Sequence, residues 1–154
     1  MTNINGIKGK IIFIGSCLVA LLWFYAALSK IAAHGHYQDA MLKQPFPTAI
    51  RYLLIWTLPP FELLIGITLL TERFFRTGLY ISAALFGIFA VYIALILIKA
   101  FGHIPCSCGG LIEHMGWKFH LGFNLAFLAL NLYLIFIDQK RSYVTYKDKF
   151  NRSL

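Results

Sequence analysis

Charged residues are scarce in this sequence. Of its 154 residues, 14 are Lys or Arg and only six are Asp or Glu, so charged side chains make up 13% of the chain. A soluble domain carries about 25% charged residues. At the same time, 59% of the residues are hydrophobic and the mean hydropathy is +0.71. This balance excludes an ordinary soluble domain and predicts that lipid is the main solvent of the protein.

The formal net charge of +8 does not by itself indicate a nucleic-acid partner. The Lys and Arg residues mostly lie between or beyond the apolar segments, with a cluster in the C-terminal tail. That placement is typical of a membrane protein, and the sequence predicts no nucleic-acid binding. Because no series of ionisable residues follows several apolar segments, a channel or transporter is also disfavoured.

Four apolar runs cover residues 11–28, about 50–70, 79–98 and 121–137. A membrane-spanning helix needs about 20 apolar residues. We therefore predict an all-α protein, a bundle of four transmembrane helices that forms a single membrane domain over residues 1–154. The expected spans are about 11–30, 50–72, 78–99 and 117–138, followed by a basic tail at 139–154. The first run is 18 residues long, whereas the apolar core of a signal peptide has about 7 to 15 residues. We therefore interpret this run as a retained span.

The second run is interrupted by Pro59 and Pro60. Proline is tolerated in the first helical turn and kinks a helix interior. Two interpretations follow: a kinked helix that contains both prolines, or a shorter span that begins at Pro60 and continues toward Phe75.

The distribution of Lys and Arg predicts the orientation. With four spans both termini share one side, and that side carries nine Lys or Arg residues against five on the other. Because basic residues stay in the cytoplasm, both termini are predicted to be cytoplasmic. The loops at about 29–50 and 99–118 then face outward, into the periplasm of a bacterium, and the protein is predicted to lie in the bacterial inner membrane.

The second outward loop contains Cys106 and Cys108, which Pro105 and two glycines bracket with turn residues. Disulfides persist on this side of the membrane. A Cys-x-Cys disulfide closes a very small ring under strain, and a strained disulfide is easily reduced. A reversible thiol–disulfide centre is therefore the leading interpretation. Basic side chains that are close in sequence could stabilise its thiolate by their positive charge, provided that the fold brings them near. They are Lys99, His103, His114 and Lys118.

Three other interpretations of the pair stay open. It could form a static structural disulfide or remain as inert thiols. It could also supply two ligands to zinc or copper, with His103, His114 or Glu113 completing the site. The third cysteine, Cys17, lies inside the first span and is expected to act as a small hydrophobic residue.

The last span carries His120, Asn124 and Asn131, whose spacings of four and seven place them on one helical face. Polar groups within a membrane normally face the bundle interior. The stripe is either a set of hydrogen bonds between helices or a path for electrons or protons. Glu62 is the single acidic residue within the four apolar runs, and Lys30 is its expected partner. That carboxylate is either half of an ion pair or a functional group.

These residues also carry a family resemblance. The segments 23–30 (WFYAALSK) and 60–66 (PFELLIG) resemble the DoxX-like superfamily of small four-helix membrane proteins, and 104–110 (IPCSCGG) with 117–121 (WKFHL) is similar to its redox-associated MauE branch. The resemblance covers about residues 11–137. It implies disulfide or electron-transfer chemistry outside the cytoplasm.

The sequence is compatible with two functions. The first is a membrane thiol–disulfide oxidoreductase in which Cys106 and Cys108 exchange electrons with a periplasmic thiol protein, expected to be thioredoxin-like. A quinone near His120 and Asn124 would be its partner in the membrane. Because the sequence offers one outward cysteine pair, a relay between two pairs within the chain is excluded. The second is a non-enzymatic subunit or assembly factor of a larger membrane complex, with structural or metal-binding cysteines.

Overall fold

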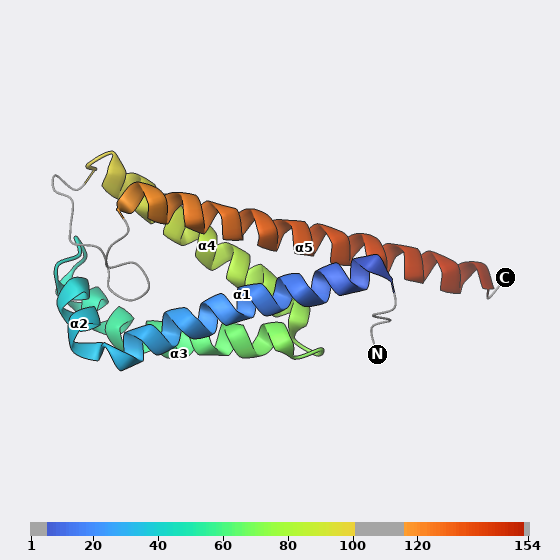
Figure 1. Cartoon of the computed structure of the whole chain (residues 1–154), viewed down its shortest axis with the longest axis horizontal. Helices are drawn as coiled ribbons and strands as arrows, with labels where there is room; N and C mark the ends of the chain where they lie inside the picture. The colour runs from blue at the N-terminus through green and yellow to red at the C-terminus, as the bar shows by residue number, and fades with distance from the viewer. Residues whose placement is uncertain (1–5, 101–115, 153–154) are drawn as a thin grey trace.

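The protein is a bundle of long helices in this computed structural model, which describes residues 6–100 and 116–152, with side chains up to residue 140 (Figure 1). Those residues contain helices and no strand. The helices, in chain order, are α1 (Ile7–Ala32), α2 (His34–Leu42), α3 (Thr48–Leu70), α4 (Phe75–Leu97) and α5 (Trp117–Arg152).

Four of these helices are long and apolar enough to cross a membrane, which confirms the predicted four-span architecture. They are α1, α3, α4 and the Trp117–Lys140 part of α5. Their outer faces expose large apolar side chains such as Leu21 (66%), Trp56 (69%) and Ile88 (62%). Such apolar faces would promote aggregation in water, whereas their contact with lipid tails is favourable.

The second span is one helix through both prolines. α3 begins at Thr48, directly after Pro47, and continues to Leu70 with Pro59 and Pro60 inside it. The interpretation in which this span begins at Pro60 is therefore wrong. Each interior proline removes the N–H that would bond to the carbonyl four residues earlier. Membrane helices tolerate this loss where neighbouring groups compensate, and Pro59 is itself buried in the bundle.

The short helix α2 was not expected from the sequence. It follows α1 after one residue and packs its Tyr37 and Met41 against Ile55 of α3. The Tyr37 hydroxyl donates a hydrogen bond to the Leu54 carbonyl at 3.1 Å. This small cluster turns the chain back from the end of α1 into the start of α3.

Neighbouring spans pack as two pairs, α1 with α3 and α4 with α5. The core between the pairs is apolar and centres on Trp23, whose ring lies 4.7 Å from that of Phe86. Glycine allows two close approaches. A Cβ on Gly15 would come within 2.7 Å of Leu134, and one on Gly66 within 2.8 Å of Phe24. Small residues at helix contacts are a common means of tight packing in membranes.

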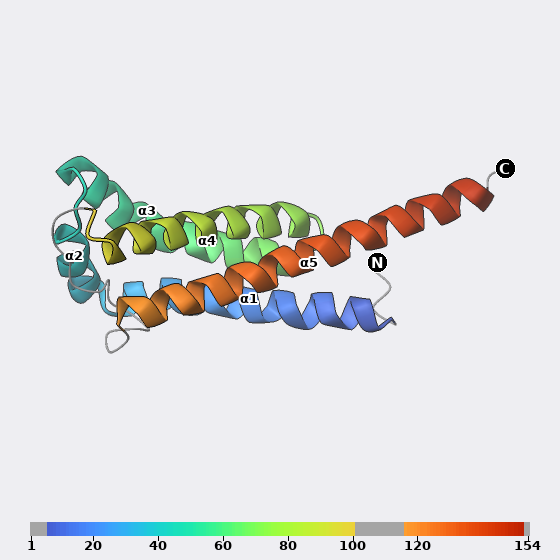
Figure 2. The same ribbon diagram turned by 90° about the horizontal axis from the view of Figure 1, so that it is seen from above.

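The helices run up and down, so α1 begins and α5 ends at the same end of the bundle (Figures 1 and 2). α5 extends well beyond the other helices at that end. Four crossings place both termini on one side of the membrane. The assignment of that side to the cytoplasm stays a prediction from the charge distribution.

Candidate functional site

The expected partnership of Lys30 and Glu62 is present in the structure. The Lys30 ammonium donates hydrogen bonds to both carboxylate oxygens of Glu62, at 2.8 and 2.9 Å, and to the Ala26 carbonyl at 3.1 Å. All three ammonium hydrogens thus have an acceptor. The Glu62 side chain is 1% exposed and that of Lys30 is 14% exposed. The ion pair connects the last turn of α1 to the interior of α3.

A buried ion pair of this kind constrains the bundle strongly. Removing one partner from a buried pair leaves an uncompensated charge and costs about 3 to 5 kcal/mol in soluble proteins. Lys30 also lies near the C-terminus of α1, where the helix dipole favours a cation. The pair therefore explains why the Glu62 carboxylate can be buried within a membrane span.

His120 lies at the same end of the bundle as this pair, in the first turn of α5 (Figure 1). The Nδ1 atom of His120 is buried and has no hydrogen-bond partner among the described residues. Its ring stacks on that of Trp117, with centroids 6.3 Å apart and an interplanar angle of 17°. α1, α3 and α5 thus contribute Lys30, Glu62 and His120 to the polar side chains at this end of the bundle.

Asn124 and Asn131 point into the bundle and hold α5 against α4. The Asn124 side-chain amide donates to the Phe86 carbonyl at 2.7 Å, and that of Asn131 donates to the Ser82 hydroxyl at 2.7 Å. The Trp23 indole N–H donates to the same hydroxyl at 2.8 Å. These contacts favour the interpretation of both asparagines as links between helices.

The sequence interpretation missed two residues of this network, Trp23 and Ser82. Both are fully buried, and together with Asn131 they join α1, α4 and α5. A serine within an apolar run was the available signal for this link. Nothing in the sequence, however, identified the residues that would meet it.

Hydrogen bonds and a ring contact hold the loop between α2 and α3 at the same end of the bundle as the ion pair. The Tyr92 hydroxyl donates a hydrogen bond to the buried Gln44 side chain, and the Tyr92 ring stacks on Phe46 at 5.1 Å. Arg51 donates to the Phe46 and Leu42 carbonyls at 2.6 Å each. An arginine at the beginning of an apolar run was the signal for this anchor, and the sequence interpretation did not use it.

Lys99 closes α4 in an uncommon conformation. Its φ is 57°, in the left-handed region that glycine usually occupies after a helix. The Lys99 N–H bonds to the Ile96 carbonyl at 2.9 Å, and the Ala100 N–H bonds to the Leu95 carbonyl at 3.0 Å. This pair of bonds is a Schellman motif. Lys118, the other lysine predicted to stabilise a thiolate, is exposed in the first turn of α5.

The predicted cysteine centre lies outside the described residues. The residues concerned are Cys106, Cys108, His103 and His114, and what the sequence predicts for them stays a prediction. Cys17 is a free, partly buried thiol in the first span. Among residues 6–100 and 116–140, no three His, Cys, Asp or Glu side chains gather closely enough to hold a metal ion.

A comparison with protein families gives one match of nearly full length. Residues 8–137 match the family model described as "Methylamine utilisation protein MauE". No curated protein and no solved structure matches the chain.

Proposed function

The chain belongs to the MauE family of membrane proteins, and on that premise we propose that it is a membrane thiol–disulfide oxidoreductase of the bacterial inner membrane. Its reactive centre is Cys106-Ser107-Cys108. The observation that carries the proposal is the buried Lys30–Glu62 ion pair, which lies at the end of the bundle where α5 begins with His120 in its first turn (Figure 1). Intramembrane ionisable residues are rare and mark functional sites by default.

Chain connectivity links the cysteines to the same end of the bundle as the ion pair. The segment that carries them leaves the end of α4 and returns at the start of α5, and His120 is in the first turn of α5. Lys99 and Lys118 lie at the two described ends of this segment. A nearby cation lowers the free energy of a thiolate, which is the nucleophile in thiol–disulfide exchange. Both lysines are therefore assigned a supporting role.

The proposed reaction is a two-step exchange. A thiolate of a reduced, thioredoxin-like partner attacks one sulfur of the Cys106–Cys108 disulfide, which breaks that bond and forms a mixed disulfide. The second thiolate of the partner then attacks the partner's sulfur in the mixed disulfide. The partner leaves as a disulfide, and Cys106 and Cys108 keep the two electrons and take up two protons as thiols. The reverse sequence would instead oxidise the pair and reduce the partner.

A membrane quinone is the proposed acceptor for these electrons. It would supply a carrier of two electrons and two protons that is soluble in lipid. The Nδ1 atom of His120 is buried and has no partner among residues 6–100 and 116–140, and it fits the hydrogen-bonding needs of a quinone carbonyl. The stacked Trp117 ring adds an aromatic neighbour. The Asn124 amide N–H₂ already donates to Phe86, so its contribution would be to hold α5 in place.

Redox titration with thiol labelling tests this proposal. The Cys17→Ser variant is used throughout, so that only Cys106 and Cys108 can react. An oxidoreductase should show a reversible two-electron couple. One of the variants Cys106→Ser and Cys108→Ser should also accumulate a reducible mixed disulfide with the partner, and Cys106→Ser is expected to accumulate more of it, since Cys108 precedes two glycines.

Two results would instead favour a non-enzymatic subunit or assembly factor of a larger complex. In one, the pair resists mild reduction, and both serine variants lower the folded yield equally without trapping a partner. In the other, the purified protein holds stoichiometric metal that both variants lose.

A further inference from the structure

The end of the bundle that holds the chain termini gathers basic side chains from several parts of the fold. α1 begins there with Lys8 and Lys10, and Arg73 lies in the turn between α3 and α4. Lys140 ends the span of α5 at the same level, with its ammonium 4.5 Å from the Phe136 ring centroid. All four of these basic side chains are exposed.

The formal charge of the protein is unevenly divided between the two ends. The end with the termini carries nine Lys or Arg residues and three acidic residues, Glu72, Asp138 and Asp148. The opposite end, with its connecting segments, carries five Lys or Arg residues and also three acidic residues. Six of the eight net positive charges therefore belong to the end with the termini.

α5 extends this charge beyond the span. Its membrane-spanning part ends at Lys140, but the helix continues to Arg152 and projects past the other helices (Figures 1 and 2). At about 1.5 Å per residue, residues 141–152 add about 18 Å. The headgroup layer of one leaflet is about 5 to 8 Å thick. A helix that continues from its span thus crosses this layer and reaches past it.

The basic residues of this extension lie at the depth of the headgroups. Arg141 directly follows the span, and Lys147 and Lys149 come about 10 to 14 Å after Lys140 along the helix. An exposed charge acts over a Debye length of about 8 Å at physiological ionic strength. These three charges are therefore within the headgroup layer or within about one Debye length of it.

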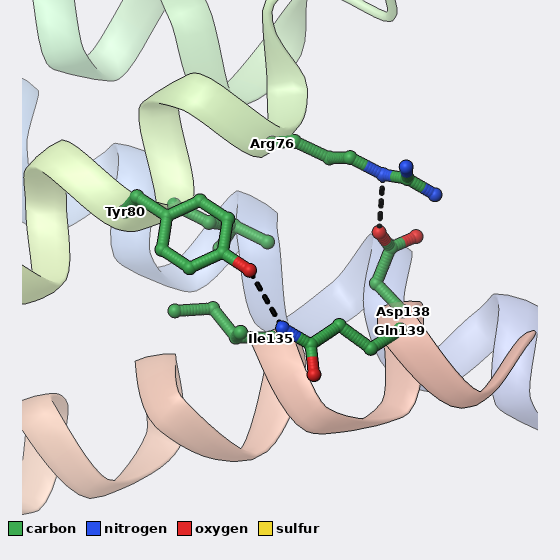
Figure 3. A pocket seen from close by; sticks show the side chains of 6 residues that line it. Arg76, Tyr80, Ile135, Asp138 and Gln139 are labelled. Carbon is green, nitrogen blue, oxygen red and sulfur yellow. Dashed lines mark hydrogen bonds and ion pairs between the residues drawn. The ribbon is translucent and has the colours of Figure 1, made fainter. Parts of the chain in front are cut away.

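Two contacts hold α5 against α4 where the extension begins. The Arg76 Nε–H donates to Asp138 at 2.8 Å, and the Gln139 amide donates to the Tyr80 hydroxyl at 2.6 Å (Figure 3). The base of the extension is thus fixed to the bundle. The ion pair also balances the Asp138 carboxylate, which is the acidic residue nearest to Arg141 in the sequence.

Aromatic residues accompany the basic ones at this end. Phe74 is 50% exposed and Phe136 is 53% exposed. On the extension, Tyr143, Tyr146 and Phe150 follow one another at spacings of three and four, which place them on one face of the helix. Aromatic residues among lysines and arginines are typical of segments that contact a membrane surface.

We propose that the basic end of the bundle, including the extension of α5, binds anionic phospholipid headgroups in the leaflet on the side of the termini. The complementary charge of these headgroups identifies the partner. Juxtamembrane clusters of four to eight Lys or Arg residues attract anionic lipids, and one such residue near the surface favours association about fivefold. Bound anionic lipid neutralises the basic side chains and holds the extension at the membrane surface.

Electron paramagnetic resonance of the full chain in phosphatidylcholine membranes tests the proposal, with lipids spin-labelled in the acyl chain as probes. Lipids in contact with the protein are recognised by their restricted motion. Labelled phosphatidylglycerol should associate several-fold more strongly than labelled phosphatidylcholine. The preference should fall in 1 M salt, where the Debye length is about 3 Å. No cysteine chemistry enters this assay, so its outcome is independent of the proposed redox function.

Variants of the extension test whether its charges cause the preference. Arg141→Gln/Lys147→Gln/Lys149→Gln removes half of the net charge of this end and should lower the preference about twofold or more. Arg141→Lys/Lys147→Arg/Lys149→Arg keeps every charge and should retain it.

A matched control removes three exposed lysines from the opposite end. Lys43→Gln/Lys99→Gln/Lys118→Gln changes the total charge equally and should lower the preference less. Equal losses in the two glutamine variants would overturn the proposal, as would a wild-type protein that does not prefer phosphatidylglycerol. If the glutamine variant of the extension keeps the preference but dissociates a dimer in light scattering, the partner is a second copy of the chain and the lipid assignment is wrong.

Discussion

Lys30 and Glu62 are unequal partners, and this inequality can be tested. Glu62 is 1% exposed within α3, whereas Lys30 is 14% exposed in the last turn of α1 and has a long, flexible stem. A lysine near a helix end can extend its ammonium toward the headgroups when its partner is lost. The Glu62 carboxylate has no comparable route out of the bundle.

The two single variants should therefore differ in stability. Lys30→Met leaves the carboxylate buried without its counter-charge and should cost about 3 to 5 kcal/mol. Glu62→Gln keeps a group that can accept from Lys30, and should cost close to the about 0.6 kcal/mol average of intramembrane polar contacts. The double variant Lys30→Met/Glu62→Gln removes both charges and should be more stable than Lys30→Met alone, because no isolated charge remains.

Equilibrium unfolding in mixed detergent micelles, with helicity as the signal, measures all four proteins of this double-mutant cycle. Equal losses in the two single variants, or strictly additive losses in the double variant, would refute the reasoning. A separate result would assign a functional role: if Glu62→Gln abolishes redox turnover and leaves the folded yield intact, the carboxylate takes part in the reaction.

Three further predictions concern other parts of the chain. In intact spheroplasts a membrane-impermeant thiol reagent should label reduced Cys106 or Cys108 and never Cys17; labelling that requires broken membranes would reverse the orientation. Ser82→Ala leaves the Trp23 and Asn131 donors without their acceptor and should lower the free energy of unfolding by about 1 to 3 kcal/mol per unsatisfied group. The control Thr57→Ala removes a hydrogen bond within one helix at an exposed position and should lower it much less in the same assay. Lys99→Gly should raise the free energy of unfolding by about 1 kcal/mol, since glycine adopts positive φ without strain. If the cysteines of this variant also react more slowly with a thiol reagent, the lysine charge supports the thiolate. Unchanged reactivity would mean that Lys99 only ends the helix.

The four spans could be predicted from the sequence because the bilayer imposes a simple local requirement. Every backbone N–H and C=O within hydrocarbon must be bonded, so an apolar run of sufficient length has to be a helix. The partnership of Lys30 with Glu62 was predictable for a related reason. A single buried carboxylate needs a counter-charge, and one lysine was available at the same end of the neighbouring span. The inward direction of Asn124 and Asn131 followed from helical spacing alone.

The partners that these polar groups meet depend on how the helices pack, and sequence spacing carries no information on the register between separate helices. For this reason Ser82 as the shared acceptor of Trp23 and Asn131 emerged from the tertiary structure alone. Packing also decided the path of α3 through Pro59 and Pro60, where local rules allowed two answers. The amino-acid sequence thus determined which segments are helices in lipid, whereas contacts between helices decided which polar side chains meet between them, as at Ser82.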